Sequence, residues 1–344
     1  MYQNCTDFGC APGGTPVRLL TLKNEVLSCT LVTLGAALRS LLVPGRNGEP
    51  VDVVLGCDSP EDYLASPDYL GAIVGRYANR IGDGQFYLNG KLCQLSVNSG
   101  KNHIHGGFCG FTHRVWDVAE LSDTRAVLTL ESPDGEEGYP GNLQARVTYA
   151  LEGRALSIRY EASCDEDTVC NLTNHAYFNL SGHASGPAMD QWVAILADRY
   201  LPSGTDGIPV GPPQSVEDSP MDLRKLTALE SRVDMDFFQL RQSGGFDHCF
   251  ALNGKLGQLR PAARAVSSAT GVTMTMETTL PGIQLYTANG LETGRRGKGG
   301  VCYGPRHAFC LETQFFPDSP NRPDFPSPFL RAGARYDHTT VYRF

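Results

Sequence analysis

The stretch ALSIRYE, residues 155–161, alternates apolar and polar side chains along its whole length. Its apolar members are Leu156, Ile158 and Tyr160. Because successive side chains of a strand point to opposite faces, a period of two predicts a β-strand with one buried and one solvated face. VTMTME at 272–277 repeats the pattern. Strands of this kind are typical of antiparallel sheets that cover a core with one face.

Turn residues divide much of the chain into short segments. Asn89-Gly90 stands between QFYL and KLCQ and predicts a two-residue hairpin, because both central residues of a type I′ turn need positive φ. Gly82-Asp83-Gly84 predicts the turn before it. DLRKLTALES at 222–231 is one of few segments that predict a helix, with Asp222 as its cap. With 38 Gly and 22 Pro, we expect an all-β fold, a large antiparallel β-sandwich with few short helices.

Length and charge limit the kind of protein. The 344 residues contain no linker, composition shift or repeat, which predicts a single domain over 1–344. The formal charge of −8, with mostly scattered Lys and Arg, offers no basic face for nucleic acid. The one basic cluster, GRRGK at 294–298, is expected to be a mobile solvated loop, with phosphate binding as the alternative.

Cysteine usage and the N-terminus indicate the compartment. The 11 cysteines are odd in number and lack a CxxC pair or zinc-like spacing, which favours buried free thiols in a reducing environment. The first residues show no signal-peptide pattern, and no stretch reaches the ~18 apolar residues of a membrane span. We expect a cytoplasmic protein without membrane partners.

One carboxylate stands out inside an apolar run. AFCLETQFFPDSPN at 308–321 places Glu312 in what otherwise reads as a buried strand. A buried carboxylate needs either a satisfying partner or a role for which a raised pKa is useful. Glu312 is therefore a candidate general base, and a salt-bridged structural Glu is the alternative.

Five further motifs precede this segment. In chain order they are GRYANRI (75–81), NHIHGG (102–107), NHAYFNLSGH (174–183), GGFDHCF (244–250) and PGIQLYTANG (281–290). Together with the Glu312 segment, and from about Leu20 to the C-terminus, the chain resembles the aldose 1-epimerase (galactose mutarotase) family. The resemblance implies a large two-sheet fold and an isomerase that interconverts the anomers of free hexoses such as galactose and glucose.

The resemblance also assigns sugar contacts. His103 and His105 should face the same side of an extended segment, where a metal half-site or a surface coincidence is the alternative. The family pattern favours His105 as the substrate contact and leaves His103 structural or peripheral. It carries Asn79 and Arg80 into the sugar site, where the guanidinium fork suits vicinal hydroxyls. Read alone, Arg80 would be a solvated surface residue.

Three more residues receive roles from the same comparison. His175, which alone would be a buried neutral His, becomes the general acid. Asp247, otherwise an Asx-turn residue beside glycines, becomes an acceptor for sugar hydroxyls. Gln284 can both donate and accept toward a hydroxyl pair, with an exposed strand Gln as the alternative.

The implied mechanism needs one base and one acid. Glu312 would remove the C1 hydroxyl proton while His175 protonates the ring oxygen, without metal, nucleotide or covalent intermediate. Apolar neighbours should raise the pKa of Glu312, and His175 should begin protonated beside it.

Alternative functions remain from other classes. They are a hexose-6-phosphate 1-epimerase, a glycoside hydrolase using Glu312 and Asp247, and a non-catalytic sugar-binding module. The sequence leaves open the preferred sugar and the oligomeric state, for which a monomer or a weak dimer both fit.

Overall fold

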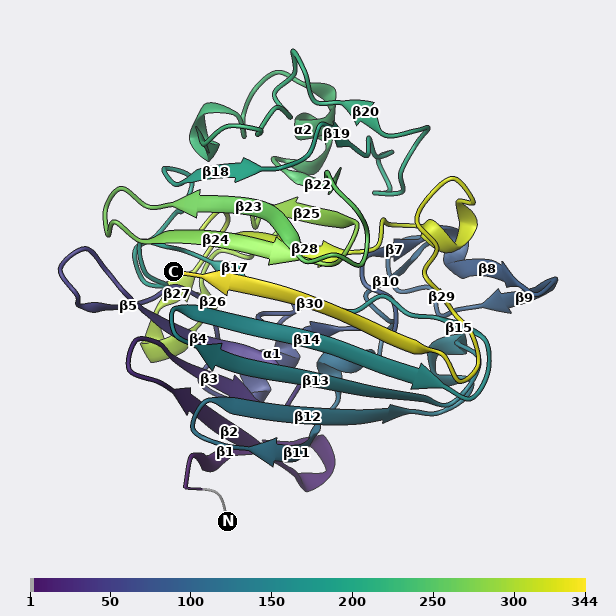
Figure 1. The fold of residues 1–344 in the computed structure, drawn as a ribbon, viewed down its shortest axis with the longest axis horizontal. Coiled ribbons are helices and arrows are strands. Elements are labelled where there is room, and N and C mark those ends of the chain that lie inside the picture. The colour runs from purple at the N-terminus through teal and green to yellow at the C-terminus, as the bar shows by residue number, and fades with distance from the viewer. Residues whose placement is uncertain (1–2) are drawn as a thin grey trace.

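The computed structural model describes residues 3–344, and its named strand pairs are all antiparallel. The largest sheet has nine strands in the order β11-β12-β13-β14-β30-β24-β23-β18-β21. Its C-terminal strand β30 lies between β14 and β24, in the middle of the sheet (Figure 1). The strands of this sheet are β11 (Asp117–Leu121), β12 (Arg125–Ser132), β13 (Leu143–Glu152), β14 (Ala155–Cys164), β30 (Arg335–Arg343), β24 (Thr273–Thr278), β23 (Arg260–Val266), β18 (Trp192–Ile195) and β21 (Thr227–Ala228).

Two further sheets complete the main architecture. The six-stranded sheet comprises β17 (Tyr177–Phe178), β28 (Phe309–Gln314), β25 (Gly282–Tyr286), β22 (Asp247–Ala251), β19 (Arg199–Tyr200) and β20 (Gln214–Ser215), in that order. The five-stranded sheet runs in sequence order through β1 (Cys5–Ala11), β2 (Thr15–Lys23), β3 (Ser28–Val32), β4 (Ala37–Pro44) and β5 (Pro50–Asp52). Two α-helices of six residues each occur among residues 3–344, α1 (Pro60–Ala65) and α2 (Phe238–Ser243).

Short pairs of strands and 3₁₀ turns connect these sheets. The pairs are β7 (Arg80–Ile81) with β10 (His103–Ile104), β16 (Thr173–Asn174) with β6 (Ile73–Val74), β8 (Gln85–Leu88) with β9 (Lys91–Gln94), β15 (Thr168–Val169) with β29 (Phe329–Leu330), and β26 (Arg295–Arg296) with β27 (Cys302–Tyr303). The 3₁₀ turns are Pro12–Gly14, Gly82–Gly84, Phe111–His113, Glu136–Gly138, Leu229–Ser231, Lys298–Gly300 and Ser319–Asn321.

One apolar cluster lies between the sheets, and it determines which side chains of β28 point away from the core. Leu156 and Ile158 of the nine-stranded sheet belong to the same cluster as Phe309 and Leu311 of β28. Since side chains alternate along a strand, the residues between Phe309, Leu311 and Thr313 point away from this core. Glu312 is one of them, so its carboxylate lies on the other face of the six-stranded sheet.

The predicted all-β sandwich with few short helices is confirmed. Residues 155–161 lie in β14, and 272–277 form β24 with a start one residue later than predicted. The hairpin prediction is also correct, because β8 and β9 pair across Asn89 and Gly90, whose φ angles are 51° and 77°.

The predicted helix at 222–231 is wrong. Thr227 and Ala228 form the edge strand β21, which pairs with β18, and the carbonyl of Leu223 accepts a hydrogen bond from the Ile195 amide at 2.7 Å. The Asp222 carboxylate accepts from the amide and side chain of Arg224 and caps no helix. Pairing to an open sheet edge satisfied these backbone groups, and weak helix propensity did not compete with it.

Three other predictions have mixed outcomes. All 11 cysteines are unbonded, but Cys5, Cys10, Cys93, Cys109 and Cys302 are not buried, contrary to prediction. The basic loop is not simply solvated: Lys298 is buried, with Nζ 2.6 Å from Asp52 Oδ2. Among residues 3–344, no helix has the length and apolar character needed to cross a membrane.

Candidate active site

Strand pairing in the six-stranded sheet brings three predicted residues together. Glu312 of β28 lies directly opposite Gln284 of β25, which in turn lies opposite Cys249 of β22. Asp247, two residues before Cys249, projects from the same face. The Gln284 side-chain amide donates to Asp247 Oδ1 at 2.7 Å. The Gln284 side-chain oxygen accepts a long hydrogen bond from Gln314 Nε2 at 3.5 Å, and the second oxygen of Asp247 is available for a ligand on this face.

A short strand pair brings in Asn79, Arg80 and His105. Arg80 of β7 pairs with Ile104 of β10, and His105 follows immediately. The backbone leaves the extended conformation at His105, with φ 52°, and turns sharply through Gly106. A Cβ on Gly106 would lie 1.8 Å from the Gly75 carbonyl oxygen, so only glycine fits.

This turn corrects one prediction. The extended geometry ends at Ile104, so His103 and His105 do not share a site. His103 is fully buried between the Tyr139 hydroxyl, 2.6 Å from its Nε2, and the Ser96 carbonyl, 2.7 Å from its Nδ1. His105 lines the candidate cavity, and His103 does not.

His175 reaches Glu312 from the chain between β16 and β17. Its backbone is held by the segment before β6, since the His175 amide donates to the Ala72 carbonyl and its carbonyl accepts from the Gly71 amide, each at 2.9 Å. The ring stacks on Tyr177 with centroids 5.0 Å apart. His175 Nε2 lies 3.6 Å from Glu312 Oε2, so a base and an acid face the same small space.

All seven predicted site residues line one cavity of about 160 Å³. They are Asn79, Arg80, His105, His175, Asp247, Gln284 and Glu312. The sequence analysis missed Asp68, Tyr69, Tyr177 and Tyr286, which also line the cavity. Tyr177 and Tyr286 lie inside quoted motifs and could have been found by strand alternation, whereas nothing in the sequence around Asp68 and Tyr69 distinguishes them.

Glu312 is buried without a hydrogen-bond donor. It is 2% exposed, and among residues 3–344 nothing donates to its Oε2. Burial raises the pKa of the Glu312 carboxyl well above its usual value, the Asp247 charge raises it further, and Arg80 opposes the shift. The predicted direction is confirmed. A salt-bridged structural Glu would have a Lys or Arg at its carboxylate, and among the described residues it has none.

The protonation predicted for His175 is wrong for the free site. Burial lowers the pKa of His175 to about 4, and neither its backbone nor Asp247 offsets this. Burial therefore opposes charge on Glu312 and on His175 when each titrates alone. The neutral pair and the pair with charged Glu312 and His175 hold the same number of protons, so a single proton transfer interconverts them.

The pH dependence of thermal stability should show the cost of ionising the buried Glu312 carboxyl. Because its folded-state pKa is raised, its contribution to stability is complete at low pH and is lost as pH rises through that pKa. Gln cannot ionise, so the Tm of Glu312→Gln minus the wild-type Tm should grow from pH 5 to pH 9. Thermal melts of both proteins in matched buffers check this, and a pH-independent difference would contradict the raised pKa.

A metal ion fits these residues poorly, although ligand atoms of His105, His175 and Glu312 lie within 4.8 Å of one another. The backbone N–H of Asn79 donates a hydrogen bond to His105 Nδ1 at 3.1 Å. The neutral His105 ring must then carry its proton on Nε2. A metal-binding His shows the opposite arrangement, with a bare nitrogen on the metal and the other N–H donated outward. Burial also lowers the pKa of His105 well below its usual value, which keeps the ring neutral.

We expect prolonged treatment with EDTA to leave the catalytic rate unchanged. The reason is that His105 Nε2 is a fixed donor for a sugar oxygen and has no lone pair for a metal. Rates before and after chelation and gel filtration check this. If activity is lost and Zn²⁺ restores it, the site binds a catalytic metal ion and this prediction is wrong.

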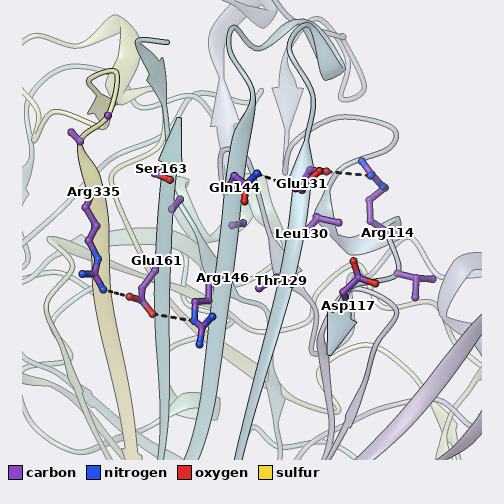
Figure 2. Close-up of a pocket in the computed structure, with 15 residues that line it drawn as sticks. Arg114, Asp117, Thr129, Leu130, Glu131, Gln144, Arg146, Glu161, Ser163 and Arg335 are labelled. Atoms are coloured by element: carbon purple, nitrogen blue, oxygen red, sulfur yellow. Dashed lines mark hydrogen bonds and ion pairs between the residues drawn. The ribbon is translucent and has the colours of Figure 1, made fainter. Parts of the chain in front are cut away.

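A second cavity, of about 610 Å³, lies across the outer face of β12, β13, β14 and β30. Figure 2 shows Glu161 between Arg335 and Arg146, with which it forms ion pairs. Gln144 likewise donates to Glu131 at 3.0 Å. The residues that line this cavity include no histidine. His105, His175 and Glu312 instead lie together in the smaller cavity.

Comparison with known proteins shows which family the chain is similar to. The family model "Aldose 1-epimerase" matches residues 18–343. The chain is 42% identical over 340 residues to galactose mutarotase of Mus musculus, covering 98% of this chain and 97% of that protein. It is 39% identical to aldose 1-epimerase of Escherichia coli, with 97% of each chain covered. A solved aldose epimerase homologue from C. elegans superimposes with a TM-score of 0.87 at 30% identity, covering 94% of this chain and 98% of that one.

Proposed function

The chain belongs to the aldose 1-epimerase family and is a carbohydrate isomerase, and we propose that Glu312 and His175 interconvert the anomers of a free hexose in the cavity that they line. The observation that carries the assignment is the buried Glu312 carboxylate, without a donor among the described residues and 3.6 Å from His175. Anomer exchange needs ring opening, rotation about the C1–C2 bond and reclosure.

The proposed steps use only this chain's residues. Glu312 removes the proton of the C1 hydroxyl, and His175 delivers a proton to the ring oxygen, so that the ring bond breaks as the C1 carbonyl forms. Before each turnover the shared proton lies on His175, and binding of a polar sugar between the two groups stabilises that charged form against the burial that otherwise opposes it. After rotation the step runs in reverse: the C5 hydroxyl gives its proton to His175 as its oxygen attacks C1, and Glu312 returns its proton to the C1 oxygen.

The other residues orient the sugar. The His105 Nε2–H is a fixed donor toward the ring-oxygen side. Among residues 3–344, the Arg80 guanidinium forms no ion pair, so its fork of N–H groups is free for hydroxyls. Asp247 and Gln284 form an acceptor and donor pair beside Glu312. The cavity thus offers both hydrogen-bond donors and acceptors to the hydroxyls of a free hexose.

Polarimetry tests the proposal against the alternatives. Freshly dissolved α-galactose or α-glucose should lose optical rotation faster with enzyme than without it. A glycoside hydrolase would instead release reducing sugar from a disaccharide, and a binding module would do neither. Comparison of the two sugars also measures the preferred substrate. Absence of acceleration with both sugars would overturn the proposed function.

We also propose a cytoplasmic location. The supporting observation is that all 11 cysteines are unbonded, which is typical of proteins in reducing compartments.

A further inference from the structure

Asp68 is a third carboxylate in the wall of the active-site cavity, and the proposed proton transfers do not use it. It follows α1 and lines the cavity between Pro67 and Tyr69. The residue is only 8% exposed. A nearly buried carboxylate that contacts a ligand cavity needs a structural or a functional reason.

Two groups fix the position of this carboxylate. The Ser66 hydroxyl donates to Asp68 Oδ2 at 2.8 Å, and Arg295 Nε lies 3.3 Å from the same oxygen. Arg295 also donates to the Ala65 carbonyl at 3.3 Å, which ties the basic loop to the end of α1. Within residues 3–344, no group donates to the other oxygen, Oδ1. Asp68 therefore presents a rigid carboxylate with an acceptor oxygen free for a ligand hydroxyl.

The charges of the cavity favour a neutral ligand. Its lining includes the carboxylates of Asp68 and Asp247, the Glu312 carboxyl, whose ionisation burial opposes, and one guanidinium, Arg80. Arg295 does not line the cavity, and its guanidinium contacts Asp68, which does. Lys298 of the same loop is engaged by Asp52. A neutral sugar can donate hydroxyl protons to these carboxylates, whereas a phosphate group brings up to two negative charges against them.

We propose that Asp68, held in place by Arg295, is a specificity residue that accepts a hydroxyl of a neutral sugar and excludes sugar phosphates. This inference builds on the proposed function and names the substrate class of that site. From the sequence alone the basic loop could bind phosphate. In the structure the loop instead opposes phosphate binding, because its Arg295 holds the negatively charged Asp68 at the cavity wall.

The test replaces the charge without changing the shape. In Asp68→Asn the amide cannot repel an anion, and the Arg295 guanidinium loses one of its two carboxylate partners. We measure mutarotation of α-galactose by polarimetry in the presence of glucose, glucose 6-phosphate or inorganic phosphate as competitors. For wild type, only glucose should compete. For Asp68→Asn, the inhibition constant of glucose 6-phosphate relative to that of glucose should fall at least about tenfold, and inorganic phosphate should become a competitor.

Two further variants separate this role from general disturbance. Glu292 is the other partner of Arg295, at 3.0 Å, but its side chain is 70% exposed and outside the cavity. Glu292→Gln should behave as wild type. Arg295→Gln keeps the Asp68 carboxylate but removes the guanidinium that holds its position. This variant should still exclude phosphates, while its KM for α-galactose should rise.

An unchanged inhibition ratio in a folded, active Asp68→Asn would overturn the proposal. Competition by inorganic phosphate with the wild-type enzyme would overturn it even if that variant failed to fold. Failure of the proposed function looks different, because the wild type would then not accelerate mutarotation of any free sugar. In that case, calorimetric binding of inorganic phosphate to Asp68→Asn and not to wild type would still support anion exclusion by Asp68.

Discussion

Replacing Glu312 with Gln should lower kcat by roughly 10²–10⁴ while sugar binding stays measurable. The amide keeps the shape of the carboxylate and its place opposite Gln284, but it cannot take a proton from the C1 hydroxyl. Polarimetry on α-galactose gives kcat, and calorimetric titration with the sugar gives the binding constant. The buried amide should be tolerated, because Glu312 makes no ion pair with Lys or Arg among residues 3–344 that the change would break.

A matched control is available on the nine-stranded sheet. Glu277 of β24 is a strand Glu in contact with Arg343 at 3.3 Å, well outside the cavity. Glu277→Gln should leave kcat within about twofold of wild type, since surface substitutions away from a site have small effects. If Glu312→Gln retains activity within about threefold of wild type, Glu312 is not the base, and Asp247 becomes the carboxylate to test next.

Local sequence signals predicted the strands well where one face is buried. The period of two at 155–161 and the Asn-Gly pair at 89–90 reflect constraints that act within a few residues. The segment at 222–231 shows the limit of such signals. Part of this segment forms a strand because it pairs with β18, which lies about thirty residues earlier in the chain. A local sequence pattern does not show such a long-range pairing.

The seven site residues were assigned mainly through ordered motifs, and the structure brings all of them to one cavity. The electrostatics were predicted less well. Burial of Glu312 in an apolar run correctly indicated a raised pKa. For His175, the prediction of a protonated ring considered only the nearby carboxylate, whereas burial has the larger effect. The depth of a side chain depends on the whole fold, so a sequence cannot rank these two opposing contributions.

Asp68 and the basic loop illustrate a different limit. The sequence separates Asp68 from Arg295 by more than two hundred residues, and only the fold places the two groups 3.3 Å apart. A cluster of Arg and Lys suggested an anion site because a sequence shows charges without their partners. The pairing of Lys298 with Asp52 and of Arg295 with Asp68 reverses that interpretation.

The two histidines of the cavity should differ in the kinetic parameter that each affects. If His175 donates the proton to the ring oxygen, His175→Asn should lower kcat by roughly 10²–10⁴, with a smaller change in KM. His105 is a neutral donor whose Nδ1 is occupied by the Asn79 amide. His105→Asn removes an orienting contact, so it should raise KM and lower kcat less severely. Initial rates over a range of α-galactose concentrations separate the two parameters.

The comparison is informative because the rings occupy similar surroundings. Their centroids lie 5.4 Å apart, both side chains are nearly buried, and Tyr69 lies near both rings. His175 alone faces Glu312 and stacks on Tyr177, so His175→Asn could also loosen that strand, and its Tm must be close to that of His105→Asn before the rates are compared. A larger loss of kcat in His105→Asn, with mainly a KM change in His175→Asn, would assign the proton to His105. Such a result would require the neutral Nε2–H of His105 to act as the acid, and the pH profile of kcat would then no longer depend on the titration of His175.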